Sequence, residues 1–173
     1  NCATLRRNLA ANGCAHAEAV HAAVGAAAGE ACVFKSSANA GDHRTFHSSG
    51  GRSREAVHMI ALDDHFPRGQ RIDFIKMDIQ GAEGAALKGM RRVLTSNPGL
   101  VLLMEFWPCG LMQAGVDPLA VLDDLRGMGF TLEWIDDDAK DLRPIRDFKE
   151  FTGRIEGARY ENIVARAPGA LPA

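Results

Sequence analysis

The chain has 173 residues, 46% of them hydrophobic and 24% charged, and a formal net charge of -2 at pH 7. This length and apolar content predict one domain with a sizeable hydrophobic core. The small net charge disfavours nucleic acid and anionic membrane surfaces as partners, and no run reaches the roughly 18 apolar residues of a membrane span.

The first half of the chain predicts one helix, short strands and a long loop. Leu5 and Leu9 stand four residues apart and Asn12-Gly13 supplies a helix end, which predicts a helix over residues 3–11. Strands are predicted at residues 18–24, 31–35 and 56–62. Residues 36–54 are rich in Ser, Gly, Asn and charged side chains, and we expect a loop there.

Strands and helices alternate in the second half. Buried strands are predicted at residues 72–78 and 100–106, and further strands at 130–135 and 162–167. An apolar stripe from Ala86 to Leu94 predicts a helix after the first of these strands. Asp117-Pro118 predicts the start of another helix, and Gly129 its end. Residues 136–157 are charged and irregular. The alternation predicts an α/β fold, a doubly wound and mostly parallel sheet with right-handed crossovers.

Two acids stand at predicted strand ends, Asp78 at the end of one strand and Glu105 at the end of the next. In open α/β sheets ligands bind beyond the carboxyl ends of the strands, so we expect the two carboxylates to converge there if the strands are neighbours. Such a pair needs a proton, a lysine or a metal cation to offset its repulsion. Lys76 lies on the same strand face as Asp78. As an alternative, Asp78 or Gln80 caps the following helix; for Glu83 we favour a favourable interaction with the dipole of that helix.

The segment "IDFIKMDIQGAEGAALKGMRRVL", followed by "PGLVLLMEFWP", resembles the FkbM family of S-adenosylmethionine-dependent methyltransferases. The family pattern is a strand ending in Lys-x-Asp-aliphatic-Glu-Gly-x-Glu, then a helix and a strand ending in Glu. Further similar segments are "LRRNLAANG", "AAVG", "NAGDHR", "IALDDHF" and "ENIVARA", so the resemblance covers nearly all of residues 1–167. It implies a Rossmann-like methyltransferase core.

The chain departs from the family pattern in two respects. Gln80 stands where the family usually has Glu, which removes a charge but keeps a hydrogen-bonding group of similar shape. The family's first strand, its glycine-rich loop and the acid that ends its second strand have no counterpart here. By this resemblance they would lie upstream of Asn1. We therefore expect residues 1–173 to form a single, partial FkbM-type domain without the first βαβ portion.

The resemblance implies transfer of a methyl group from S-adenosylmethionine to a hydroxyl of a sugar, a glycan or a small secondary metabolite. Either Asp78 or Glu105 is then the general base, or both hold a divalent cation, for which magnesium would suit oxygen ligands. Lys76 and His43 are further candidate catalytic residues; the unperturbed pKa of histidine lies near neutrality.

Weaker candidates surround this centre. The loop residues Asn39, Asp42 and Arg44 and the strand-end Trp107 are candidate substrate contacts, although a solvated loop and a structural tryptophan explain them equally well. For the cofactor, the resemblance places Ala23 and Val24 beside the adenine and adds Asp78 as a contact. The first group is predicted to bind the substrate and the second to bind the cofactor.

Two other functions stay open. One is a non-catalytic Rossmann-like binding or scaffold domain that has lost the donor site. The other is a different nucleotide-dependent enzyme, such as a dehydrogenase, but no GxGxxG motif follows any predicted strand, which counts against it. The four cysteines are widely spaced and predict reduced thiols of a cytoplasmic protein. The expected partner is the acceptor substrate, and a homo-oligomer is left open.

Overall fold

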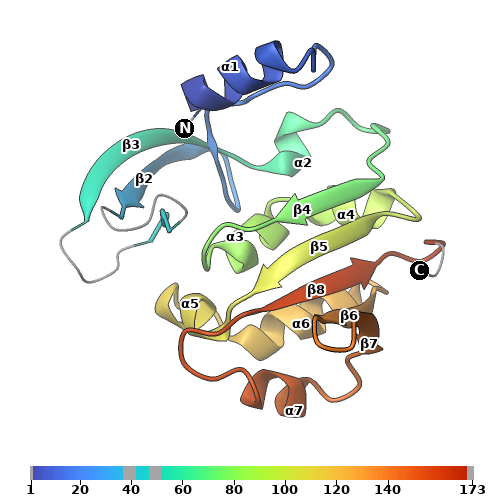
Figure 1. The fold of residues 1–173 in the computed structure, drawn as a ribbon. Coiled ribbons are helices and arrows are strands. Elements are labelled where there is room, and N and C mark those ends of the chain that lie inside the picture. The colour runs from blue at the N-terminus through green and yellow to red at the C-terminus, as the bar shows by residue number, and fades with distance from the viewer. Residues whose placement is uncertain (1, 37–41, 47–51, 171–173) are drawn as a thin grey trace.

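The computed structural model describes residues 2–36, 42–46 and 52–170, which form two separate β-sheets with helices packed around them (Figure 1). The larger sheet has the order β4-β5-β8-β6-β7 and the smaller one β1-β3-β2. The strands are β1 (Ala23–Val24), β2 (Gly29–Lys35), β3 (Ser53–Ile60), β4 (Phe74–Met77), β5 (Val101–Phe106), β6 (Thr131–Asp136), β7 (Asp141–Pro144) and β8 (Glu161–Arg166). The helices are α1 (Cys2–Ala11), α2 (Leu62–His65), α3 (Glu83–Lys88), α4 (Arg91–Ser96), α5 (Pro108–Gln113), α6 (Pro118–Gly127) and α7 (Phe148–Gly153).

The α/β class is as predicted, but the expectation of a mostly parallel sheet is wrong for the described residues. Only β4 with β5 and β1 with β3 pair in parallel, whereas β8 is antiparallel to both β5 and β6, and β2–β3 and β6–β7 are antiparallel. Antiparallel neighbours need only a short connection, and a tight turn joins β6 to β7. Because β8 lies between them, β5 and β6 run in the same direction without touching.

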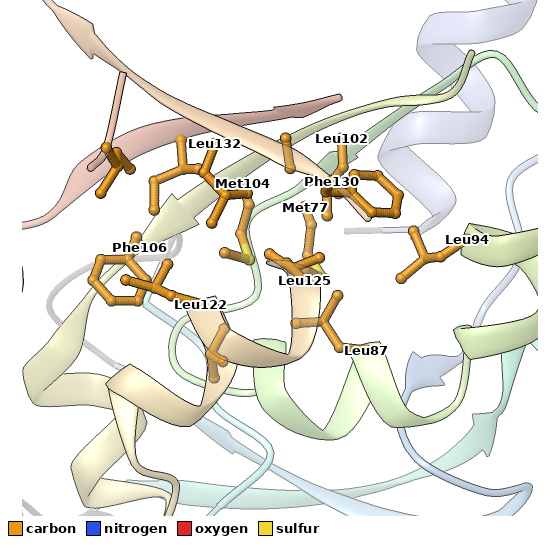
Figure 2. Packing of buried hydrophobic residues seen from close by; sticks show 14 of the residues in the cluster. Met77, Leu87, Leu94, Leu102, Met104, Phe106, Leu122, Leu125, Phe130 and Leu132 are labelled. Carbon is orange, nitrogen blue, oxygen red and sulfur yellow. The ribbon is translucent and has the colours of Figure 1, made fainter. Parts of the chain in front are cut away.

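One face of the larger sheet carries the core. Along β5 the side chains of Leu102, Met104 and Phe106 are fully buried and alternate with half-buried ones. Figure 2 shows this buried face of β5 against Leu122 and Leu125 of α6. Burying a side chain of this size contributes about 1.5–3 kcal/mol. The core therefore fixes β5 in the sheet, and the edge strand β4, of which only Met77 is buried, pairs with it.

Several elements differ from the sequence prediction. The helix expected after β4 is divided into α3 and α4 at Gly89, where an added Cβ would lie 2.0 Å from the backbone oxygen of Gly25. The first predicted strand is reduced to β1, and β7 and α7 lie inside the segment expected to be irregular. Asp117 does begin α6 as predicted, because its side chain accepts a hydrogen bond from the Leu119 amide.

The described residues contain no helix with the length and apolar character needed to cross a membrane. All four cysteines are free thiols in the structure.

Asp63 of α2 fastens the region of the smaller sheet to the helices of the larger one. Its two carboxylate oxygens accept hydrogen bonds from the amides of Arg92 (2.8 Å) and Val93 (2.9 Å), at the second and third positions of α4. Met90, the residue that precedes α4, provides no side-chain cap. Asp63 therefore caps α4 from another segment of the chain. Arg92 returns the contact by donating to the backbone oxygens of Asp63 and Phe66.

We expect Asp63→Ala to destabilise the protein by about 2 kcal/mol, because two amides at the start of α4 lose their acceptor. For a domain of this size that loss lowers the Tm by roughly 4–8 °C. Thermal unfolding followed by circular dichroism measures the change. The matched control is Asp64→Ala at the neighbouring exposed residue. Equal Tm values for the two variants would contradict the capping role.

Candidate functional site

The two strand-end acids converge as their positions predict. β4 and β5 are adjacent and parallel, with Met77 opposite Met104 in the register. Asp78 and Glu105 directly follow these two residues and so lie side by side at the carboxyl ends of the two strands. Since neighbouring strands are about 4.8 Å apart, the two carboxyl groups come within reach of a common partner. The sequence predicted this edge as the site.

Gln80 is that common partner. Its side-chain nitrogen Nε2 donates one hydrogen bond to Asp78 Oδ1 (2.9 Å) and another to Glu105 Oε2 (2.8 Å). The backbone of Gln80 is left-handed, with φ of 55°, and Gly81 follows with φ of 97°. A left-handed residue other than glycine is held against its local preference. The tight turn after β4 therefore places the amide between the two acids.

Lys76 gives Asp78 a second partner. Its ammonium nitrogen Nζ lies 3.2 Å from Asp78 Oδ2, and the two side chains are 59% and 42% exposed. An ion pair this exposed adds little to stability, typically less than about 1 kcal/mol. Its consequence is local, because it keeps a positive charge beside Asp78.

The two carboxyl groups differ in proton affinity. The pKa of Glu105 is raised to about 7, first by burial and further by the negative charges of Asp78 and Glu83. Burial acts in the same direction on Asp78, but hydrogen bonds from Gln80 and Lys76 and the charge of Lys76 outweigh it and lower the pKa of Asp78. When Glu105 is protonated, it donates a hydrogen bond to Asp78. Near neutral pH, Asp78 is therefore ionised, and Glu105 is present in both its protonated and its ionised form.

Glu83 is a third acid near this pair, and it binds the backbone of the turn after β4. It is 1% exposed, and its Oε1 accepts from the amides of Ile79 (3.3 Å) and Gly81 (3.2 Å). Burial raises the pKa of Glu83 although these backbone hydrogen bonds oppose the rise. Its position in the first turn of α3 agrees with the predicted structural role. The alternative of a cap by Asp78 or Gln80 is wrong, because Ala82 precedes α3 without a side-chain cap.

The candidate substrate contacts are engaged with one another. Asp42 forms ion pairs with Arg44 and Arg52, and the Arg44 guanidinium lies 4.7 Å from the centroid of the Trp107 ring. Trp107 is 8% exposed, and its ring N–H finds no acceptor within the described part of the chain. Asn39 lies outside the described residues. Substrate binding by these residues stays a prediction.

No hydrogen bond or ion pair joins His43, Ala23 or Val24 to either acid in the described part of the chain. His43 Nδ1 accepts a hydrogen bond from the Ser36 amide at 3.3 Å. Ala23 and Val24 pair with β3, and Gly25 after them lies against Gly89, at the end of α3 that is remote from Asp78. The structure shows no contact of these three residues with either acid among the described residues. Their catalytic and cofactor-binding roles stay predictions.

The described residues do not form a cation site. No group of three or more His, Cys, Asp or Glu side chains is placed to hold a metal ion in the ranges that the structure describes. Both oxygens of Asp78 and Oε2 of Glu105 accept hydrogen bonds from an amide NH₂ or a lysine ammonium, which are donors and cannot coordinate magnesium. The arrangement therefore does not fit the predicted magnesium site.

The sequence did not predict the role of Gln80, which was considered as a helix cap and as a departure from the family pattern. It also missed Phe46 and Gln113, which contact Arg44 from the same loop and from α5. The acids Asp78 and Glu105 could be found because they end apolar strands. No local pattern marks a side chain whose partner lies 69 residues away, as Gln113 does for Arg44.

A model of the Methyltransferase FkbM domain matches residues 1–132 of the chain. The match includes both strand-end acids, the turn with Gln80 and the loop that carries Arg44. No curated protein and no solved structure matches the chain.

We expect Glu105→Gln to stabilise the protein at pH 8 but not at pH 5. The raised pKa means that folded Glu105 binds a proton more tightly than unfolded Glu105, so its contribution is present at low pH and is lost as the pH rises through about 7. Glutamine keeps the shape and removes the repulsion from Asp78. The expected gain at pH 8 is roughly 1 kcal/mol, or about 2–4 °C in Tm.

Thermal unfolding at both pH values measures this difference. Glu133→Gln on β6 is the control for replacing a strand carboxylate, since Glu133 pairs with Arg166 and lies off the site. A stabilisation by Glu105→Gln that is the same at pH 5 and pH 8 would contradict the assignment of the pKa.

Proposed function

The chain belongs to the FkbM family of S-adenosylmethionine-dependent methyltransferases, and on this premise we propose that it methylates a hydroxyl group of a sugar, a glycan or a small secondary metabolite. The observation that carries the proposal is the pair of unlike carboxyl groups at the ends of β4 and β5, bridged by Gln80. Transfer to a hydroxyl requires a group that removes the hydroxyl proton, and this pair provides one.

Glu105 is the general base in this proposal. An efficient base has a pKa near the working pH, and burial places that of Glu105 at about 7. Asp78 stays ionised and accepts a hydrogen bond from protonated Glu105, so the transferred proton is stabilised where it arrives. This choice separates two acids that the sequence alone left as equal candidates for the base.

Gln80 orients the two carboxyl groups, and Lys76 offsets the negative charge of Asp78. The Gln80 amide holds both carboxyl groups through one nitrogen, which fixes the direction of the Glu105 oxygen. The ammonium of Lys76 offsets the charge of Asp78. In consequence Asp78 remains an anion beside a neutral or charged Glu105 through the reaction.

The residues present fit the charge of the methyl donor. S-adenosylmethionine, when bound, supplies a methyl group on a positively charged sulfur that leaves as a neutral thioether. Asp78 and Glu105 put negative charge at the strand ends, which attracts such a cation. The buried N–H of Trp107, which has no acceptor among the described residues, is suited to an oxygen acceptor on a ligand. Backbone contacts of Ala23 and Val24 with the adenine belong to the proposal through the family alone.

We expect Asp78→Asn and Glu105→Gln each to lower methyl transfer at least a hundredfold in the full-length protein, because the base or its anionic partner is lost. The assay measures S-adenosylhomocysteine formed from S-adenosylmethionine over a panel of monosaccharides, glycans and hydroxylated metabolites. In the wild type, kcat/KM rises about tenfold per pH unit below pH 7 and levels off above it, as Glu105 loses its proton.

Circular dichroism checks that both variants fold, and Glu133→Gln serves as the control that keeps activity. Wild-type turnover by both variants would refute the base assignment. A wild type that neither turns over any acceptor nor binds S-adenosylhomocysteine in calorimetry would instead support the non-catalytic scaffold.

We further propose that the enzyme works without a divalent cation, because the acids face hydrogen-bond donors. EDTA should leave wild-type turnover unchanged, and calorimetry should detect no magnesium binding at millimolar concentration. Gln80→Glu replaces the amide donor by a third carboxylate and should gain magnesium affinity, since oxygen ligands are what this ion prefers. Loss of wild-type activity in EDTA, restored by magnesium, would contradict the proposal.

A further inference from the structure

Arg44 is held on all sides by the protein. Its Nε donates to Asp42 Oδ1 at 2.7 Å, and a terminal nitrogen donates to Gln113 Oε1 at 2.8 Å. Its guanidinium lies 4.7 Å from the ring centroid of Trp107 and 5.8 Å from that of Phe46. Only 12% of its side chain is exposed. With its charge paired and its guanidinium close to two rings, Arg44 has little left to offer a substrate.

The backbone of Arg44 is fixed as well. Its amide and carbonyl exchange hydrogen bonds with those of Phe34 at the end of β2, at 3.2 and 2.7 Å. The side chain meanwhile reaches Trp107 and Gln113, which precede and end α5. Arg44 therefore joins the smaller sheet to the element that follows Glu105.

Close contacts lead from Arg44 back to the turn of the acid pair. The Trp107 ring lies on Gly110, where an added Cβ would be 2.1 Å from a ring carbon. At Gly81 an added Cβ would be 2.7 Å from the Gly110 oxygen and 3.0 Å from the Phe46 ring. Gly81 directly follows Gln80. The contacts thus form a closed circuit that begins and ends at Arg44 and includes the turn of Gln80.

We propose that Arg44 is a positioning residue that clamps the turn holding Gln80, and so keeps the Gln80 amide between Asp78 and Glu105. In this role, the contacts of Arg44 hold the Phe46 ring against Gly81 and the Trp107 ring against Gly110. Asp42, which also pairs with Arg52, keeps the guanidinium in place. This rests on the proposed function only for its effect on turnover, because the clamp itself is a property of the protein without ligands.

The first test is made on the free protein. In ¹⁵N-labelled protein the side-chain NH₂ signals of Gln80 are identified by their loss in Gln80→Glu. Arg44→Ala should move these signals toward those of a free glutamine side chain. The matched control is Arg154→Ala, because Arg154 also lies close to two rings, 3.7 Å from the centroid of Trp134 and 4.8 Å from that of Phe151, but in another part of the fold.

The control should lower the Tm without moving the Gln80 signals. Unchanged Gln80 signals in folded Arg44→Ala would overturn the proposal. If Arg44→Ala does not fold, Arg44→Lys replaces it, since lysine keeps the charge but cannot stack or bond in a fork as arginine does. The same shift of the Gln80 signals is expected for it, and its absence would overturn the proposal equally.

The second test uses turnover. A positioning role predicts that Arg44→Lys lowers kcat about tenfold or more with little change in the acceptor KM, since misplacing a reacting group acts on the chemical step. A rise in KM with unchanged kcat would show a substrate contact and overturn the proposal. A wild type without methyl transfer would refute the proposed function, whereas the Gln80 signals would still decide the clamp.

Discussion

The parallel pairing of β4 with β5 is the constraint on which the site depends. Its register brings Asp78 beside Glu105, and two carboxylates at that separation repel each other unless a donor or a proton intervenes. The structure supplies the amide of Gln80, the ammonium of Lys76 and the proton of Glu105. Each offsets part of the repulsion, and the unequal result makes one acid an anion and the other a group that titrates near neutral pH.

The turn after β4 shows how the fold secures that arrangement. A left-handed Gln80 is locally unfavourable, so neighbouring contacts must hold it. The buried carboxylate of Glu83 accepts hydrogen bonds from two backbone amides of the turn. Gly110 and Phe46 pack against Gly81, which follows Gln80. These contacts come from α3, α5 and a loop that is distant in sequence. The orientation of one amide therefore depends on tertiary packing rather than on the turn alone.

This division explains what the sequence could and could not predict. Apolar runs ending in Asp78 and Glu105 predicted both strands and their convergence, and Asp117-Pro118 predicted the start of α6, because these signals are local. The insertion of β8 between β5 and β6 was missed, since an apolar pattern gives a strand but not its neighbour. The same limit hid the partners of Arg44, because nothing near it in the sequence points to Gln113 or Trp107.

The exchange of the family's usual Glu for Gln80 is consistent with a working site. A third carboxylate between Asp78 and Glu105 would add like charge and require a cation, whereas the amide nitrogen donates to both acids at once. The charge removed at position 80 is thus one that the arrangement has no means to offset without a metal. Because that nitrogen serves both acids, moving it would alter the proton affinity of Glu105 and the charge of its neighbourhood together. The substitution changes how the acid pair is compensated and leaves the pair itself intact.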